Sequence, residues 1–304
     1  MGGVLLVCVA AILWGTVGVA SSFMSDPGVA DPAVMGLVRT TLGASVLIAG
    51  AVALGMPLPG LRQFPFRALL VFGVAGAVFQ ICLFAGFERV GVTVTVAVTV
   101  CAPVVLVAIA DTLWRRQMPD RLVMIAIAVA AGGVLLARPA AGIDAEAAGT
   151  IDASGVGVLA AASIAFAVLA LAARSMSGRL HPLGVAGFGL AATALAVAGF
   201  LALERGAAGF VLAPPSGGDL MILAYVGIVA TGGAYLAFVL GLHRGRSAAT
   251  GLTATLIEPG VAAVLAAVVL GEQLTRPEVS GCLLMLAAVV LLFAAERRAL
   301  RGRQ

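Results

Sequence analysis

Ten long apolar stretches dominate the chain, and short segments rich in proline, glycine and charged residues separate them. Each stretch is close to the ~20 residues with which an α-helix crosses the hydrocarbon core of a membrane. The stretches lack the apolar–polar alternation that marks membrane-spanning strands. The pattern therefore predicts ten transmembrane helices, at residues 3–24, 32–54, 67–88, 91–113, 121–138, 154–173, 183–203, 219–242, 248–270 and 278–296.

The arginines indicate how these helices are oriented. If both ends of the chain face the cytoplasm, thirteen of the 18 arginines fall in cytoplasmic segments and Arg39 lies within a span. Only Arg89, Arg138, Arg205 and Arg276 then fall outside. Cytoplasmic loops of membrane proteins are enriched in basic residues. We therefore expect a multi-pass protein of the cell membrane with both termini in the cytoplasm.

The two halves of the chain are similar to each other. Residues 97–118 and 253–274 align at a constant offset of 156, which pairs Pro103 with Pro259. Five spans in each half give the halves opposite orientations, and inverted repeats of this kind provide alternating access to a site between them. We predict an all-α membrane protein of ten transmembrane helices, arranged as two inverted five-helix repeats around a central cavity. Its predicted parts are a first repeat (1–140), an extracytoplasmic linker (141–153), a second repeat (154–296) and a basic cytoplasmic tail (297–304).

Composition narrows the class of protein. Of the 304 residues, 62% are hydrophobic and 11% are charged, whereas a soluble domain has about 25% charged residues. The net charge of +4 comes from arginines in short clusters between apolar stretches, so it indicates topology rather than nucleic-acid binding. The expected partners are the lipid bilayer and a small-molecule substrate, and we expect a monomer or weak dimer.

Two charged residues lie within predicted spans, where charge is costly and therefore indicates function. Glu258 counts to the middle of the ninth span and is followed by Pro259, which lacks an N–H group. It can bind a cationic group or a proton, or it can form an ion pair between helices. Arg39 lies about 10 Å inside the second span. It can clamp a substrate carboxylate or phosphate, pair with Glu258, or stabilise an outward gate.

Several uncharged residues are further candidates for substrate binding. Trp14 and Gln80 count to the middle of their spans; Trp14 can form a cation–π wall or pack in the core, and Gln80 can orient a ligand. Tyr235 is expected to cap the inner side. Pro103 and Pro259 are hinge candidates, because helices usually kink at proline. The threonines near these prolines can line the cavity or bond to their own helix backbone; they are Thr95, Thr99, Thr253 and Thr255.

Other classes of protein fit the sequence less well. A membrane enzyme needs a nucleophile with a base or a metal pair, but the two histidines, His181 and His243, lie in predicted loops and no hydrolase or metalloprotease motif is present. We therefore expect no catalytic residues, metal or cofactor, and leave proton coupling open. A channel needs a ring of like residues, and a structural membrane protein needs neither Glu258 nor Arg39 in its interior.

These features resemble those of the drug/metabolite transporter superfamily, EamA type, over nearly the whole chain. The matching marks are Trp14-Gly15, Arg39, and Glu258-Pro259 followed by residues 270–275, Leu-Gly-Glu-Gln-Leu-Thr. The resemblance implies a secondary transporter that exports or exchanges a small metabolite, such as an amino acid. The alternative is a multidrug or cation exporter of the same fold. The chain departs from the family pattern at residues 115–119, where the first half lacks the Gly-Glu signature. Small multidrug exporters of the superfamily use a glutamate in their first span, whereas the first span here has no acidic residue, which argues against cation export by their mechanism.

Overall fold

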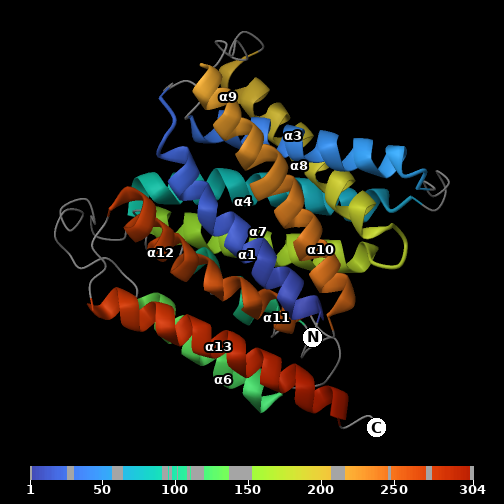
Figure 1. The fold of residues 1–304 in the computed structure, drawn as a ribbon. Helices are drawn as coiled ribbons and strands as arrows, with labels where there is room; N and C mark the ends of the chain where they lie inside the picture. The colour runs from blue at the N-terminus through green and yellow to red at the C-terminus, as the bar shows by residue number, and fades with distance from the viewer. Residues whose placement is uncertain are drawn as a thin grey trace.

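The computed structural model describes residues 2–25, 31–56, 64–90, 95, 98–100, 102–107, 110, 120–136, 153–206, 216–245, 248–271 and 276–301. The named elements in these ranges are all helices (Figure 1). They are α1 (Gly2–Ser21), α3 (Pro32–Ala53), α4 (Phe66–Val90), α6 (Arg121–Leu136), α7 (Ala153–Met176), α8 (Pro182–Arg205), α9 (Gly217–Ala224), η2 (Tyr225–Gly233), α10 (Ala234–Arg244), α11 (Ala248–Thr253), η3 (Ala254–Ile257), α12 (Glu258–Leu270) and α13 (Arg276–Arg301).

The predicted all-α membrane fold is confirmed. Within the described residues, seven helices are long and apolar enough to cross a membrane. Three shorter apolar helices, Val98–Val107, Arg121–Gly133 and Val279–Ala295, coincide with the three remaining predicted spans. The predicted tail begins at 297, but α13 continues to Arg301. The predicted linker, apart from Ala153, lies outside the described residues, as do residues 111–119 and 272–275.

Contacts between helix ends fix the relative directions of several helices. Asp31 precedes α3 and forms an ion pair with Arg205, the last residue of α8, at 3.1 Å. Ser25, which follows α1, donates its backbone N–H to Asp219 in the first turn of α9 at 2.9 Å. Both pairs are therefore antiparallel, as the predicted order of spans requires. We call the end of the bundle that carries Asp31, Arg205 and Asp219 the outer end. In Figure 1, α1 starts and α13 ends at the opposite end of the bundle.

The helix starts follow from local sequence. Asp31 caps α3 by accepting hydrogen bonds from the backbone N–H groups of Ala33 and Val34, and Pro32 occupies the first helical turn, where its missing N–H costs nothing. Ser216 caps α9 in the same way. Gly206 adopts a φ of 70° after α8, a left-handed conformation that favours glycine and ends the helix.

Two spans contain turns that the sequence pattern does not predict. The eighth span runs from α9 through the nine-residue π-helix η2 into α10, and the ninth runs from α11 through the 3₁₀ turn η3 into α12. In a regular α-helix, the Thr255 carbonyl would accept a hydrogen bond from the N–H of residue 259, but Pro259 has no N–H. In η3, the Glu258 N–H donates to this carbonyl instead. The proline therefore replaces an α-helical turn with a tighter one. The carbonyl that Pro259 frees is used locally.

The π-helix packs closely against α3 through glycines. A Cβ on Gly43 would lie 3.0 Å from the carbonyl oxygen of Gly227 and 3.0 Å from the nitrogen of Gly232. Small residues allow such backbone contact between helices in membranes. The side chain of Thr231 donates to the Val226 carbonyl five residues earlier, at 2.7 Å, which satisfies part of the widened turn. The α3–η2 contact therefore joins the two halves of the chain close to Arg39.

Candidate functional site

Arg39 is buried inside the bundle. It projects from the second turn of α3, its side chain is 9% exposed, and its Nε has no hydrogen-bond partner. Unpaired charge away from water is strongly unfavourable, so the guanidinium needs compensation from nearby groups or from a bound molecule. The sequence prediction that Arg39 faces the interior agrees with this position.

Glu258 and Tyr235 are ionisable neighbours of Arg39, and of the two only Glu258 can carry an opposite charge at neutral pH. Glu258 begins α12 directly after the buried turn η3, and Tyr235 lies in the first turn of α10 with 4% of its surface exposed. Both interact electrostatically with Arg39. Within the part of the chain that the structure describes, however, the ion pairs join Arg205 to Asp31 and Glu204, and none includes Arg39 or Glu258. The three groups are thus neighbours that do not neutralise one another by direct contact.

Glu258 is half-buried, although it lies in the interior of the bundle. Its backbone meets α1: a Cβ on Gly15 would lie 3.0 Å from the Glu258 carbonyl oxygen and 3.0 Å from Cγ1 of Val261. The Trp14-Gly15 pair of the sequence motif is explained by this contact. Glycine lets α1 touch the start of α12.

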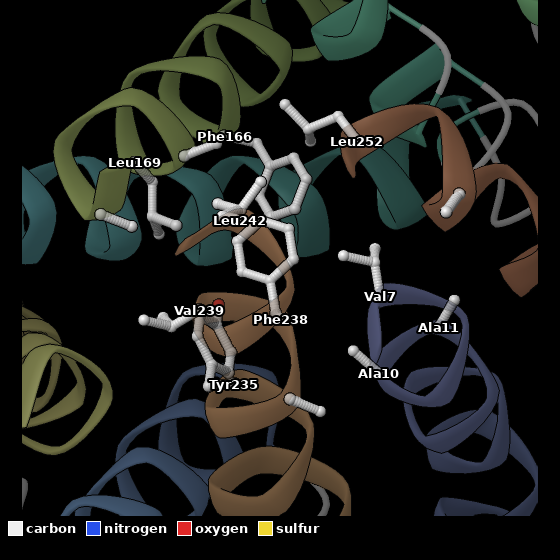
Figure 2. Packing of buried hydrophobic residues seen from close by; sticks show 14 of the residues in the cluster. Val7, Ala10, Ala11, Phe166, Leu169, Tyr235, Phe238, Val239, Leu242 and Leu252 are labelled. Atoms are coloured by element: carbon white, nitrogen blue, oxygen red, sulfur yellow. The ribbon is translucent and has the colours of Figure 1, made fainter. Parts of the chain in front are cut away.

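Trp14 contacts an aromatic cluster that spans the two halves of the chain. Its ring centroid lies 5.4 Å from those of Tyr235 and Phe238 and 6.2 Å from that of Phe166. Phe72 approaches Tyr235 at 6.4 Å. Figure 2 shows Tyr235 and Phe238 projecting from α10, with Phe238 reaching Phe166 of α7. Trp14 is only partly buried, whereas Phe166, Tyr235 and Phe238 are buried. Both roles predicted for Trp14, core packing and contact with a ligand, agree with this position.

The remaining predicted residues take different roles. The Thr99 hydroxyl donates to the Thr95 carbonyl and that of Thr255 to the Leu252 carbonyl, both at 2.7 Å, which is the local backbone bonding predicted as the alternative to cavity lining. Thr253 is buried in the last turn of α11. Gln80 is buried in α4, and its amide lies against Gly36 of α3. Pro103 is buried in the helix Val98–Val107, which places the two prolines in separate helices.

Sequence reasoning missed several interactions between the halves, and one of them lies beside Trp14. The Tyr225 hydroxyl at the start of η2 donates to the Thr16 hydroxyl at 2.7 Å, and Thr16 donates to the Leu13 carbonyl at 2.6 Å. Thr16 directly follows Trp14 and Gly15 in α1, so this hydrogen bond lies next to them, on the outer side. Tyr225 is a polar residue inside an apolar span, so the rule applied to Glu258 would also have selected it.

Charged, polar and aromatic groups enclosed among many apolar helices are features expected of a membrane transporter. The sequence profile of the EamA-like transporter family matches residues 1–138 and 153–294. The chain therefore belongs to the EamA-like transporter family.

Two further comparisons agree with this assignment. "Uncharacterized transporter YwfM" from Bacillus subtilis (strain 168) is 25% identical over 296 residues, which cover 97% of this chain and 94% of that protein. A solved crystal structure covers 96% of this chain and 98% of its own, with a TM-score of 0.75 and 18% identity. That similarity extends to the fold alone. The chain is thus a multi-pass membrane transporter of a small molecule.

The α1–α12 contact at Gly15 gives a testable prediction. Gly15→Ala places a methyl group 3.0 Å from the Glu258 carbonyl, so we expect it to destabilise the protein by about 1–3 kcal/mol, as overpacking usually does. Gly18→Ala, on the same helix with no atom within 4 Å of its Cβ, is the matched control and should be neutral or slightly stabilising. Thermal unfolding in detergent measures both. Equal unfolding temperatures for the two variants would contradict the contact.

Proposed function

We propose that this transporter exports or exchanges a small zwitterionic metabolite of the amino-acid class by alternating access. Arg39 binds the carboxylate of the solute, and Glu258 binds its ammonium group. Trp14 and Tyr235 form the aromatic wall between them. The observation that carries the proposal is the buried Arg39 guanidinium, which interacts with Glu258 electrostatically while its Nε stays unpaired.

A zwitterion satisfies both charged groups without adding net charge. A guanidinium binds a carboxylate through two parallel hydrogen bonds, and an aromatic face next to a carboxylate favours an ammonium group. A bound solute would therefore complete the pairing that Arg39 and Glu258 do not make directly. A cation exporter, the alternative considered from the sequence, has no use for a buried arginine beside its carboxylate.

We further propose that the protein consists of two inverted repeats, corresponding to residues 1–140 and 154–296. The separate family matches to residues 1–138 and 153–294 support two similar halves. The helix contacts support a two-fold relation. The first span packs on the eighth (α1 with α10) as the sixth does on the third (α7 with α4). The second packs on the seventh (α3 with α8), and the fifth on the tenth (α6 with α13). If each span of the first half is exchanged with the corresponding span of the second half, the same set of packed pairs results, as a two-fold relation requires.

Polar contacts at the outer end join the two halves and act as the gate in this proposal. Asp31 and Arg205 link α3 to α8, and Tyr225 and Thr16 link η2 to α1. These contacts separate when the halves rock apart at the outer end, and Pro103 and Pro259 act as hinges. Exposed ion pairs contribute at most about 1 kcal/mol, so such a gate opens without a large barrier. Both termini then lie in the cytoplasm, and the protein works in the cell membrane as a monomer or weak dimer.

Replacement of Arg39 tests the carboxylate site. Proteoliposomes that contain the wild-type protein should release amino acids faster than empty liposomes do. Arg39→Ala should slow release of amino acids and carboxylates by at least about tenfold, because a charge-assisted hydrogen bond contributes roughly 1.5–3 kcal/mol. Release of amines without a carboxylate should change much less. Arg179→Ala, at an exposed arginine between α7 and α8, is the control. An equal loss for every class of solute would show that Arg39 has a structural role.

Replacement of Glu258 tests both the ammonium site and proton coupling. Glu258→Gln keeps the shape of the side chain but removes its charge and its titration. We expect slower transport of amino acids and amines, and loss of any effect of a pH gradient on the rate. Glu258→Asp keeps a titratable carboxylate and should retain the pH effect. If Glu258→Gln transports with unchanged rate and pH dependence in the same proteoliposomes, Glu258 is not the ammonium or coupling site.

A further inference from the structure

A separate pocket lies at the outer end of the bundle, between α3, α4 and α8. Its volume is about 170 Å³. Residues from all three helices line it: Asp31, Ala33, Gly36, Gln80, Ile81, Ala85, Val197, Phe200, Glu204 and Arg205. Glu258, Tyr235 and Trp14 are not among the lining residues, so the pocket is distinct from the site assigned above.

The volume limits what the pocket can hold. An apolar cavity of about 150 Å³ binds benzene, whereas sites for drug-sized ligands measure roughly 300–1,000 Å³. The pocket therefore accepts a molecule of about the size of a small ring or a short branched chain. Ile81, Val197 and Phe200 supply apolar walls for such a body.

The floor of the pocket has an unsatisfied hydrogen-bond acceptor. Gln80 is 3% exposed, and its Oε1 has no hydrogen-bond partner. A Cβ on Gly36 would lie 3.4 Å from this oxygen, so glycine leaves room for the amide beside α3. A buried acceptor without a partner is unfavourable, because it has lost its hydrogen bonds to water. Oε1 is itself enclosed against α3, so a ligand in the pocket reaches it when the Gln80 side chain rotates toward the pocket, and the hydrogen bond then recovers part of the free energy that was lost.

The charges around the pocket favour a cation at this position. Two carboxylates, Asp31 and Glu204, share the single cation Arg205 at its rim, at 3.1 and 3.8 Å. Asp31 is also engaged by the backbone N–H groups that it caps, whereas Glu204 is exposed and only loosely paired. The opposing charge is Arg39, three residues beyond Gly36 on the same face of α3. It repels a cation from the interior and so favours one on the outer side of Gln80.

We propose that this pocket is a second binding site, for the ammonium group of a small amine or amino acid. The ammonium group donates to Oε1 of Gln80 and faces the carboxylate-rich rim, and the apolar body lies along Ile81, Val197 and Phe200. A carboxylate on the ligand is not required here, in contrast to the Arg39 site. Binding in the pocket does not depend on the proposed function. Only the role that we give the pocket depends on it, and that role is to hold the solute on the outer side of the transport path.

Protection of an engineered cysteine tests the pocket directly. Ala33→Cys places a thiol in the pocket lining, in a protein whose four native cysteines are replaced by alanine. A charged, membrane-impermeant thiol reagent is applied from the outside. The probes are valine, isobutylamine, which lacks the carboxylate, and isovalerate, which lacks the amine. Valine and isobutylamine should protect the thiol at similar concentrations, and isovalerate should require at least about ten times more. Ser22→Cys, at the exposed end of α1, should react at the same rate with every probe.

Changes at the floor of the pocket sharpen the test. Gln80→Leu keeps the approximate volume but removes the acceptor, so the half-protecting concentration of isobutylamine should rise about tenfold, which corresponds to ~1.4 kcal/mol. Gln80→Glu should lower it, because it adds a negative charge. Glu258→Gln, outside the pocket, should change the half-protecting concentration of isobutylamine by less than about threefold.

Three results would overturn the second site. They are equal protection by isovalerate, unchanged protection in Gln80→Leu, and an Ala33→Cys thiol that stays unreactive in folded protein while Ser22→Cys reacts. Failure of the proposed function is distinguishable from these results. If amines protect the thiol but wild-type proteoliposomes release no solute, the pocket stands and the transport proposal fails. If amino acids are transported but no probe protects, only the pocket proposal fails.

Discussion

A guanidinium enclosed among apolar helices is the constraint on which the interior of this protein depends. Arg39 interacts with Glu258 and Tyr235, yet its Nε has no partner in the structure. Buried charges are stable only when they are paired and hydrogen-bonded. The bundle thus keeps opposite charges near each other without direct contact, and a zwitterion between them would complete the pairing. The free energy of binding would come from groups that are under-satisfied while the site is empty.

Small residues make this arrangement possible. Without a hydrophobic driving force between helices in lipid, association depends on close packing. Gly15 brings α1 against the Glu258 backbone, and Gly43 brings α3 against Gly227 and Gly232 of the π-helix. The helices that carry Trp14 and Arg39 are therefore anchored directly to the second half of the chain. In the proposed alternating-access mechanism, movement of one half relative to the other would change the distance between Arg39 and Glu258 and would thereby couple binding to access.

The sequence predicts the helices far better than it predicts their irregular turns. Span positions follow from hydropathy, because every backbone group in lipid must be bonded within its own helix. Arg39 and Glu258 are predictable site candidates because charge is rare at that depth. The π-helix at residues 225–233 has no clear signature, since it depends on packing against α3 around Gly43. The outer pocket is not predictable from the sequence for the same reason. Gln80, Asp31 and Glu204 belong to three different helices, which come together only through tertiary packing. The Thr99 and Thr255 hydroxyls illustrate the opposite case, in which local backbone bonding is readable from sequence.

The central claim is that Arg39 recognises the carboxylate of a zwitterion whose ammonium group faces Glu258. The most direct test incubates purified protein with an equimolar mixture of amino acids and the amines that match them without the carboxylate. Mass spectrometry then gives the ratio of amino acid to amine that the protein retains. Wild type and Arg179→Gln should favour amino acids, and this preference should fall about tenfold in Arg39→Gln, the loss expected when one charge-assisted interaction is removed. An unchanged ratio in a folded Arg39→Gln protein would contradict the central claim.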